Sequence, residues 1–297
     1  MNKIRETFSI SDLENLSSIK AHTIRIWEKR YHLFTPNRDA NNIRYYTNED
    51  LQHLLNISFL SNYGYKISII AKLSKNEIED LILSLSSKEA TKEVVLNQFK
   101  IAMLNFNAYD FHKSYASLQI KISDEEIFYE VIFPFLNQIG LLWQTNSIKP
   151  AHEHFVSYLI INKLISLTEN LPSIRSNNTN IVYVLFLPDG EIHELGLLFI
   201  NYVLRSKGLQ TVYLGSSIPH ENLIDVKNKF NTICYISSFT VMPNKDNIDK
   251  YLECFFNDLL KDTNDRLLIT GQKVSGYSSN KSQIRIFENI KQMLMFS

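Results

Sequence analysis

The chain has 297 residues, 44% of them hydrophobic, and its 31 Lys and Arg side chains balance 31 Asp and Glu side chains. This length allows two or three domains with sizeable cores, and the apolar content excludes a largely disordered chain. No run reaches the ~18 uncharged apolar residues of a membrane helix, and no apolar segment follows the start. We therefore expect a soluble, cytoplasmic protein whose two cysteines, Cys234 and Cys254, are reduced structural thiols.

The first 75 residues predict two short helices joined by a tight turn. Residues 8–17 and 21–31 place apolar side chains at helical spacing, and the arrangement is that of a helix-turn-helix. The second helix of such a unit can lie in the DNA major groove, with Ile24, Trp27 and Tyr31 packed inward. Its polar face carries the side chains that we expect to contact DNA: His22, Thr23, Arg25, Lys29 and Arg30.

A small hairpin, or wing, is predicted for residues 37–46, followed by helices at about 47–63 and 67–73. The first 75 residues hold 11 Lys and Arg against 7 Asp and Glu, which is a modest indication of an anionic partner. Basic side chains would neutralise phosphates, and wing tyrosines would contact the DNA backbone. The residues concerned, beyond those of the second helix, are Arg38, Arg44, Tyr45 and Tyr46.

The middle of the chain is predicted to be helical throughout. Apolar spacing of period 3.6 indicates helices at 77–85, 88–105, 109–118, 124–145 and 150–169, and short loops between them imply a bundle. Within it, Trp143 and the pair Glu153-His154 stand near helix ends; taken singly, such residues are ordinarily core or solvated. Residues 172–180 are polar and predict a linker.

The C-terminal part alternates strands and helices. Strands are predicted at 181–187, from 211, at 233–237 and at 266–271, and helices at 191–206, 219–230, 246–260 and 283–295. This alternation is typical of a parallel sheet flanked by helices. The fold class is therefore multidomain α and α/β: an N-terminal winged helix-turn-helix, a central helical bundle and a C-terminal Rossmann-like sheet.

A histidine follows the first predicted strand, at the edge where open α/β sheets bind their ligands. His193 has Glu191 and Asp189 nearby and Gly196 beyond it. It is either an ordinary polar loop residue or a metal ligand whose second nitrogen is oriented by one of the two acids. The residues alone leave both readings open.

The spacing E-x-H-x-x-G resembles the D/E-x-H-x-x-G signature of cobalamin-binding domains, in which the histidine is the lower axial ligand of cobalt. The segment Ser237-Ser238-Phe239-Thr240 is similar to the S-x-L loop of the same domains, and Gly271 stands where they have Gly-Gly, with Thr270 replacing the first glycine. The resemblance implies that His193 binds cobalt. It also implies cofactor contacts from Glu191, Gly196, Ser237, Thr240 and Gly271.

Two further blocks resemble one family. The block R-x-W-E-x-R-Y, followed by P-x-R and R-Y-Y-x-x-E-D-L, resembles the winged-helix domain of MerR-type transcription regulators, and W-x9-E-H resembles the helical cap of their CarH/LitR photoreceptor branch. The second resemblance implies that Trp143 shields the upper axial ligand, with polar contacts from Glu153 and His154. The implied domains are 1–75 (winged helix), 76–171 (helical cap) and 180–297 (cobalamin-binding).

The resemblance implies a cobalamin-dependent, light-responsive transcription regulator and no enzyme. Adenosylcobalamin held between cap and sheet domain would control oligomerisation, as dimer or tetramer, and binding to a double-stranded DNA operator. The alternatives are a ligand-independent MerR-type repressor with a vestigial or protein-interaction sheet domain, and a corrinoid methyl-carrier protein.

The chain departs from the family at two positions, Thr270 and Gln144. Gln144 stands where light-sensing members have a histidine, and glutamine is a poor cobalt ligand. His152 or His154 would have to replace that histidine as an upper ligand.

Overall fold

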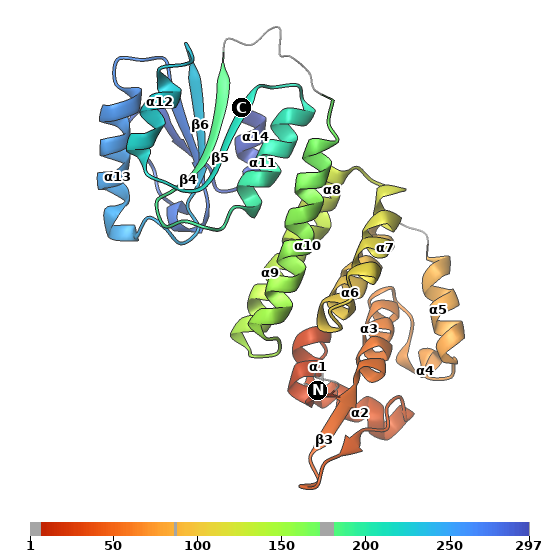
Figure 1. The fold of residues 1–297 in the computed structure, drawn as a ribbon. Coiled ribbons are helices and arrows are strands. Elements are labelled where there is room, and N and C mark those ends of the chain that lie inside the picture. Colours follow the sequence, from red (N-terminus) through yellow and green to blue (C-terminus); the bar gives the residue numbers. More distant parts are fainter. Residues whose placement is uncertain (1–6, 86–87, 173–180, 297) are drawn as a thin grey trace. The chain divides into compact units, whose positions relative to one another are not determined.

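The computed structural model describes residues 7–85, 88–172 and 181–296 (Figure 1). The chain forms two compact units, Met1–Leu159 and Ile160–Ser297, and the division falls within helix α10 (Pro150–Glu169). Each unit buries its own set of apolar side chains. No helix in the described ranges is long and apolar enough to cross a membrane.

The first unit begins with a three-stranded antiparallel sheet, of order β1-β3-β2, and four helices. Helix α1 starts at a capping box between Ser9 and Asp12, and α3 starts at a second one between Thr47 and Asp50, so polar side chains satisfy the first free amides of both helices. The elements are β1 (Thr7–Phe8), α1 (Ile10–Ser17), α2 (Ala21–Tyr31), β2 (Asn37–Arg38), β3 (Arg44–Thr47), α3 (Asn48–Asn62) and α4 (Ile67–Ile70).

The expected helix-turn-helix and wing are confirmed. Ser18 adopts a left-handed conformation (φ 62°) that ends α1 and begins the turn into α2. On α2, Ile24 and Trp27 are buried, as the sequence predicts, while Tyr31 is half-buried. β2 and β3 form the wing hairpin, with Arg38 opposite Arg44.

The bundle follows in the same unit and continues into α10. Its elements are α5 (Lys75–Ser84), α6 (Lys88–Leu104), α7 (Ala108–Gln119), α8 (Asp124–Ile127), a π-helical turn (Phe128–Ile132), α9 (Phe133–Gln144) and α10. Rings of Phe99, Phe111 and Phe135 form its centre, with centroid distances of 4.5 Å (Phe99–Phe111) and 5.6 Å (Phe99–Phe135). Aromatic pairs at these distances add to the stabilisation from burial.

The sequence predicts one helix over 124–145, and the structure inserts the π turn into it. Pro134 is the second residue after this turn, lacks an N–H group, and would crowd the carbonyl four residues earlier in a regular α-helix. The wider turn, in which the Phe133 amide donates to the Phe128 carbonyl, accommodates it.

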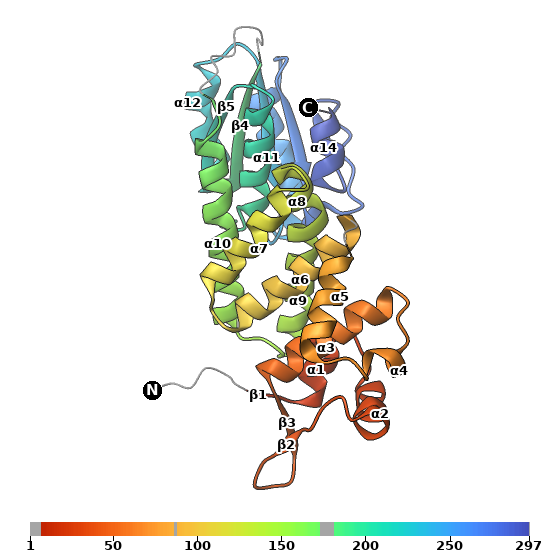
Figure 2. The same cartoon turned by 90° about the vertical axis from the view of Figure 1, so that its right-hand side faces the viewer.

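The second unit is a five-stranded parallel sheet of order β5-β4-β6-β7-β8. Helices α11 and α14 lie on one face, and α12 and α13 on the other (Figures 1 and 2). The elements are β4 (Val182–Pro188), α11 (Leu195–Ser206), β5 (Thr211–Ile218), α12 (Ile224–Lys227), β6 (Ile233–Ser238), α13 (Ile248–Phe255), β7 (Arg266–Thr270), β8 (Ile284–Ile286) and α14 (Ile290–Phe296). Short 3-10 turns cover His220–Leu223, Lys245–Asn247 and Gln272–Val274, and a π turn covers Phe256–Leu260.

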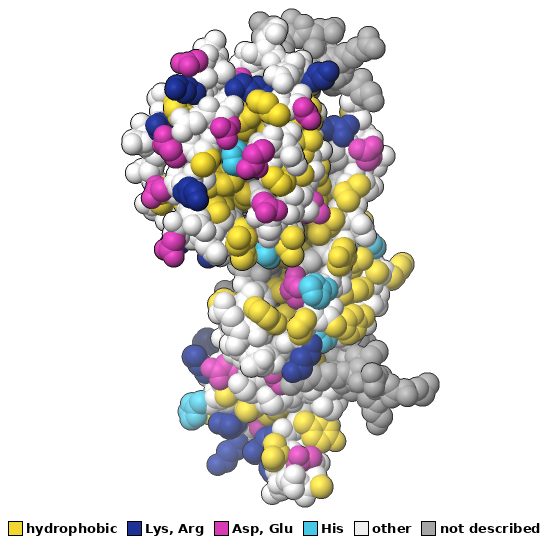
Figure 3. Space-filling model, turned by 60° about the vertical axis from the view of Figure 1, so that its left-hand side comes forward, with side chains coloured by type: hydrophobic (Ala, Val, Ile, Leu, Met, Phe, Trp, Pro, Cys, Tyr) yellow, Lys and Arg dark blue, Asp and Glu magenta, His cyan; other side chains and the backbone are white. Residues whose placement is uncertain are grey.

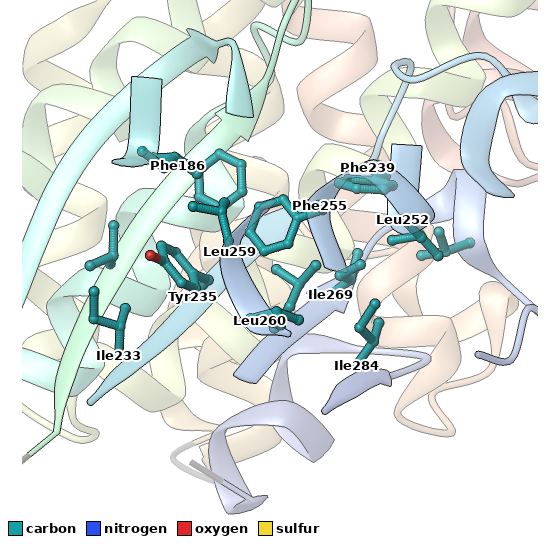
Figure 4. Close-up of a cluster of buried hydrophobic side chains, with 14 of the residues drawn as sticks. Phe186, Ile233, Tyr235, Phe239, Leu252, Phe255, Leu259, Leu260, Ile269 and Ile284 are labelled. Carbon is teal, nitrogen blue, oxygen red and sulfur yellow. The ribbon is translucent and has the colours of Figure 1, made fainter. Parts of the chain in front are cut away.

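An aromatic cluster joins α13 to the sheet (Figure 4). Phe255 of α13 stacks on Phe186 of β4 with 5.8 Å between ring centroids, and meets the edge of Tyr235 of β6 at 5.4 Å. All seven residues of β4 are buried, which explains why this strand is a continuous apolar run in the sequence.

Three sequence predictions for this unit require correction. The expected helix at 283–295 is wrong in its first part, because Ile284 and Ile286 alternate with exposed Arg285 and form strand β8 beside β7. The segment 219–230 is a 3-10 turn followed by the short α12. Helix α11 begins at Leu195 and not at residue 191. Most of the predicted linker, residues 173–180, lies outside the described residues.

Candidate functional site

Glu191 joins the loops that follow β4 and β6. Its side chain is fully buried, and Oε2 accepts hydrogen bonds from the amides of Thr240, Val241 and Met242 at 3.0, 2.6 and 2.9 Å. β4 and β6 are neighbours, and the chain leaves β4 toward β5 on the other side. The two loops therefore diverge here, and such a point in a parallel sheet is where ligands bind.

His193 is held by the same carboxylate. Its Nδ1 lies 2.6 Å from Glu191 Oε1, which also accepts the amides of Ile192 and His193. With Nδ1–H donating to the carboxylate, the lone pair lies on Nε2, for which no hydrogen bond is found in the described part of the chain. The side chain is 52% exposed. Of the two acids that the sequence offers, Glu191 and not Asp189 orients the imidazole.

Glu191 is ionised in this setting. Burial alone would raise the pKa of its carboxyl group, but hydrogen bonds from the Met242 and Val241 amides and from His193 outweigh burial and lower the pKa to about 2. The carboxylate thus carries a negative charge beside the imidazole at neutral pH. It fixes both the tautomer and the orientation of the His193 ring.

Acid is expected to destabilise the second unit through Glu191. Because the folded-state pKa is lowered from 4.5 to about 2, the stabilisation is complete above about pH 4.5 and is lost as the pH falls toward 2. The shift corresponds to about 3 kcal/mol. Calorimetric unfolding of the full chain between pH 6 and pH 2.5 would measure it. Glu191→Gln should flatten this pH dependence, whereas Asp189→Asn, at an exposed site, should retain it.

The other residues predicted for this site are distributed around the same loops. Gly196 lies in the first turn of α11, where a Cβ atom would stand 3.3 Å from Ile290 Cδ1 of α14. Gly271 has φ +119°, and a Cβ atom there would lie 2.4 Å from the Phe239 carbonyl oxygen. Thr240 contributes its amide to Glu191. Ser237 is fully buried at the end of β6.

Two observations fit a metal cofactor that brings its own macrocycle. His193 offers one oriented imidazole nitrogen, which is the single protein ligand that such a cofactor requires. The buried Ser237 hydroxyl has no hydrogen-bond partner in the described structure, so it is available to a polar group of a ligand. Among the described residues, no group of three or more His, Cys, Asp or Glu side chains converges to hold a bare metal ion. Thr270, which replaces the first glycine of the family pattern, is the last residue of β7 and is buried.

The predicted cap residues lie at the ends of α9 and α10. Trp143 stands in the last turn of α9 with its side chain 56% exposed. In the first turn of α10, Glu153 accepts a hydrogen bond from Ser157 at 2.7 Å, and its other oxygen lies 3.3 Å from His154 Nδ1. His154 is exposed.

His152 has a structural role at the same helix start. Its side chain is buried, Nδ1 accepts the Lys149 amide at 3.0 Å, and the ring stacks on Phe106. Nδ1 of His152 is therefore not available to bind cobalt, and for this atom the expectation that His152 replaces the missing histidine is wrong. His154 is the accessible imidazole of this segment.

The basic side chains expected to contact DNA lie in the first unit. Lys and Arg side chains gather near the end of this unit shown at the bottom of Figure 3. On α2, Thr23 is half-buried and the following are exposed: His22, Arg25, Lys29 and Arg30. In the wing, Arg38 and Arg44 are exposed and Tyr45 is half-buried. Arg38 is held by the carbonyl and side-chain oxygens of Asn42, each at 2.9 Å.

Tyr46 is a correction to the expected DNA contacts. It is fully buried, and its hydroxyl donates to Glu28 of α2, so the ring belongs to the core and cannot lie along DNA. Burial and this hydrogen bond raise the pKa of Tyr46. Glu28 also lies 3.7 Å from Arg44 Nε, and thereby ties the wing to α2. Sequence reasoning missed Glu28, although its place beside Trp27 in an otherwise basic helix was a signal.

Two family models match parts of this chain. Residues 8–77 match the MerR HTH family regulatory protein model, and residues 95–167 match the B12 binding domain model. The HTH-type transcriptional repressor CarH of Myxococcus xanthus is 30% identical over 231 residues, with 73% of this chain and 73% of that protein covered. The chain belongs to the CarH-like family of MerR-type regulators.

One further relative and one solved structure are similar to this chain. The HTH-type transcriptional repressor CarA of Myxococcus xanthus is 23% identical over 215 residues, covering 72% of this chain and 69% of that protein. A Methanosarcina barkeri monomethylamine corrinoid protein superposes with a TM-score of 0.56 at 14% identity, over 69% of this chain and 97% of that chain. The second similarity shows a shared fold and confirms the predicted fold class.

These findings confirm the regulatory function. As a CarH-like protein with a MerR HTH and a B12 binding domain, the chain is a cobalamin-dependent, DNA-binding transcription regulator and not an enzyme. The B12 model covers the bundle segment that holds Trp143, Glu153 and His154. The individual contacts to cobalamin and to DNA remain predictions.

Proposed function

We propose that this CarH-like protein represses transcription as a light-responsive sensor of adenosylcobalamin. His193 would hold the cobalt through Nε2, and the observation that carries this assignment is its Nδ1 bond to the buried, ionised Glu191. A neutral imidazole with a fixed tautomer is the form that a metal requires. When bound, adenosylcobalamin supplies a light-sensitive cobalt–carbon bond.

The remaining cofactor contacts in the proposal come from both units. Trp143, half-exposed at the end of α9, would shield the bound cofactor, and Glu153 and His154 would supply polar contacts to it. The free hydroxyl of Ser237 binds a polar group of the cofactor's tail. Thr240, Gly196 and Gly271 shape the loops around it. Gln144 adds no second imidazole beside Trp143, so His193 would be the one protein ligand to cobalt.

The regulatory output in the proposal is oligomerisation. The ligand favours a dimer or tetramer in which several weak DNA-binding domains act together, and avidity then raises the affinity for the operator. Trp143 and its helix would hold one position while the cofactor is bound intact and would shift when it changes, which would favour dissociation.

The test is direct. The full chain, purified with adenosylcobalamin in the dark, should show the visible spectrum of a bound corrin, and green light should change both its mass in solution and its affinity for DNA. Light that changes neither property would refute the light response. Absence of a bound spectrum would instead favour the ligand-independent repressor.

DNA contacts in the proposal are mainly to phosphates. Arg25→Ala and Arg30→Ala should each weaken DNA binding and lower the slope of log affinity against log salt by about 1. A DNA duplex selected from a random pool for binding to the wild-type chain can be titrated with each variant at several salt concentrations. These titrations would measure both the DNA affinity and its salt slope. Lys113→Ala, at an exposed position of α7, is the matched control and should change neither quantity. Unchanged slopes for both arginine variants would place the DNA elsewhere.

A further inference from the structure

The last turn of α1 makes contacts in three directions through three consecutive residues. Glu14 Oε2 accepts the amide of Ala21, the first residue of α2, at 3.1 Å. Asn15 Nδ2 donates to Ser147 Oγ, in the connection between α9 and α10, at 2.8 Å. The Leu16 carbonyl accepts Lys100 Nζ of α6 at 3.1 Å. One helical turn thus meets α2 and two parts of the bundle.

Glu14 determines where α2 begins. Residue Lys20 stands at the N-cap of α2 without a side-chain cap, and the Glu14 carboxylate occupies that role instead. It also pairs with Lys20 at 3.1 Å. The hydrogen bond from the Ala21 amide, followed by that from Lys20, lowers the pKa of Glu14. Because helix N-termini favour negative charge, a displacement of this turn would displace the start of α2.

Lys100 is costly to stability at this position. Its side chain is only 7% exposed, and burial lowers its pKa to about 8. Its ammonium group has three donors, and the Leu16 carbonyl is its only hydrogen-bond partner in the described structure. That carbonyl lies at the C-terminal end of α1 and has no partner inside the helix. The charge of Glu93, which lines the same pocket, raises the pKa of Lys100 and offsets part of the effect of burial. The ammonium group is thus held by one hydrogen bond and by the attraction of Glu93.

Ser147 connects this turn to the segment of Trp143. Ser147 is buried, its amide donates to the Leu142 carbonyl at 2.9 Å, and its hydroxyl lies 3.1 Å from Thr145 Oγ1. The Asn146 amide donates to the Trp143 carbonyl at 3.0 Å. The residues after Trp143 are therefore bonded back onto the end of α9, and a movement of that helix end carries Ser147 with it.

The contact between α1 and the bundle also leaves room for movement. A pocket of about 410 Å³ lies beside Lys100. It is lined by residues of α1, α3, α6, the π turn and α9, among them Ser17, Ser58, Asn97, Lys100, Glu130 and Gln138. Close-packed contacts resist small shifts, whereas a polar contact with an adjoining cavity allows a second arrangement.

We propose that the last turn of α1 couples the bundle segment that holds Trp143 to α2, the helix expected to contact DNA. In this scheme Ser147 transmits the position of the Trp143 segment to Asn15, Lys100 holds the adjoining carbonyl, and Glu14 passes the displacement to the start of α2. Asn15, Lys100 and Ser147 are positioning residues, because they contact neither cofactor nor DNA in this scheme. The inference rests on the proposed function only in assigning Trp143 to the cofactor.

Two alanine variants test the coupling. In the full chain with adenosylcobalamin, Ser147→Ala and Asn15→Ala should retain the cobalamin spectrum. Each should reduce the ratio of DNA affinities with and without cobalamin by about three- to tenfold, as expected for one buried hydrogen bond. The double variant should be no worse than Ser147→Ala alone, because Asn15→Ala removes only a bond that Ser147→Ala already removes.

The matched control is Asn105→Ala. Asn105 accepts a hydrogen bond from Asn48 of α3 at 2.8 Å, so this change also removes a polar contact between the DNA-binding helices and the bundle while sparing α1. It should leave the affinity ratio unchanged. An equal loss in the control, or an unchanged ratio in both α1-contact variants, would overturn the proposal.

Lys100→Met separates a structural role from a coupling role. Replacing a sparsely bonded buried ammonium with an apolar chain of similar length should raise the melting temperature of the first unit and lower the affinity ratio. A higher melting temperature with an unchanged ratio would mean that Lys100 takes no part in coupling.

Failure of the proposed function is distinguishable from failure of the coupling. If the wild-type chain does not bind cobalamin, hydrogen exchange of residues 18–31 still tests the coupling. Ser147→Ala and Asn15→Ala should accelerate exchange there, and Asn105→Ala should not. Equal exchange in all three variants would overturn the coupling whatever the ligand is.

Discussion

Replacing His193 with alanine is expected to weaken cobalamin binding by about 100-fold or more, because loss of residues that merely orient a metal ligand costs 10- to 100-fold in metal affinity. The variant removes the oriented Nε2 lone pair and leaves Glu191 bonded to the amides of the β6 loop. Titration of apoprotein with cobalamin, followed by the shift in visible absorption, measures the affinity. The shift that reports coordination by imidazole should disappear.

Two further variants sharpen this result. Glu191→Gln retains the shape of the side chain but removes its charge, and we expect a loss of about 10- to 100-fold. His112→Ala, at an exposed position of α7, is the control for a general loss of histidine and should bind as the wild type does. An unchanged spectrum in His193→Ala would show that cobalt is not bound by this imidazole, and would remove the basis for the proposed sensor site.

Gly271→Ala is expected to destabilise the second unit by about 3 kcal/mol or more, the size associated with strain at a special backbone position together with a steric clash. The glycine has φ +119°, and a Cβ atom would lie 2.4, 2.7 and 2.8 Å from the carbonyl oxygen, carbonyl carbon and nitrogen of Phe239. All three are backbone atoms, so the clash cannot be relieved by a change of rotamer. Calorimetry of the full chain would show a lower melting temperature for the unfolding of the second unit.

Gly276→Ala is the matched control for this substitution. Gly276 also has a positive φ of +73°, but no atom lies within 4 Å of the position of a Cβ atom. It should cost only about 1 kcal/mol, the usual penalty of a left-handed conformation. Phe239 directly precedes the amides that bind Glu191, so Gly271→Ala should also weaken cobalamin binding. Equal effects of the two substitutions would show that the contact with Phe239 is unimportant.

Local sequence signals predicted much of the fold and part of the site. The bounds of α2 and α10 agree with the sequence, and α10 begins at Pro150, a residue that favours the first helical turn. The place of His193 after a buried strand was predicted, but the sequence left open whether Glu191 or Asp189 orients it, and the structure shows Glu191. These features depend on residues close in sequence, where pattern and structure are directly related.

Other features depend on contacts between distant residues and could not be predicted. Tyr46 looked like a surface residue of the wing, but Glu28, 18 positions earlier, draws its hydroxyl into the core. Ser147 lies 132 positions from its partner Asn15, and Lys100 lies 84 positions from Leu16. Strand β8 is three residues long and takes its conformation from β7.

The two tryptophans make the first unit optically distinct from the second. Both Trp27 and Trp143 lie before residue 160, and their side chains are 8% and 56% exposed. A collisional quencher such as acrylamide would therefore reach Trp143 and spare Trp27. Tryptophan emission excited at 295 nm therefore reports on the surroundings of Trp27 and Trp143 without labelling. The second unit contributes no tryptophan emission in the same experiment.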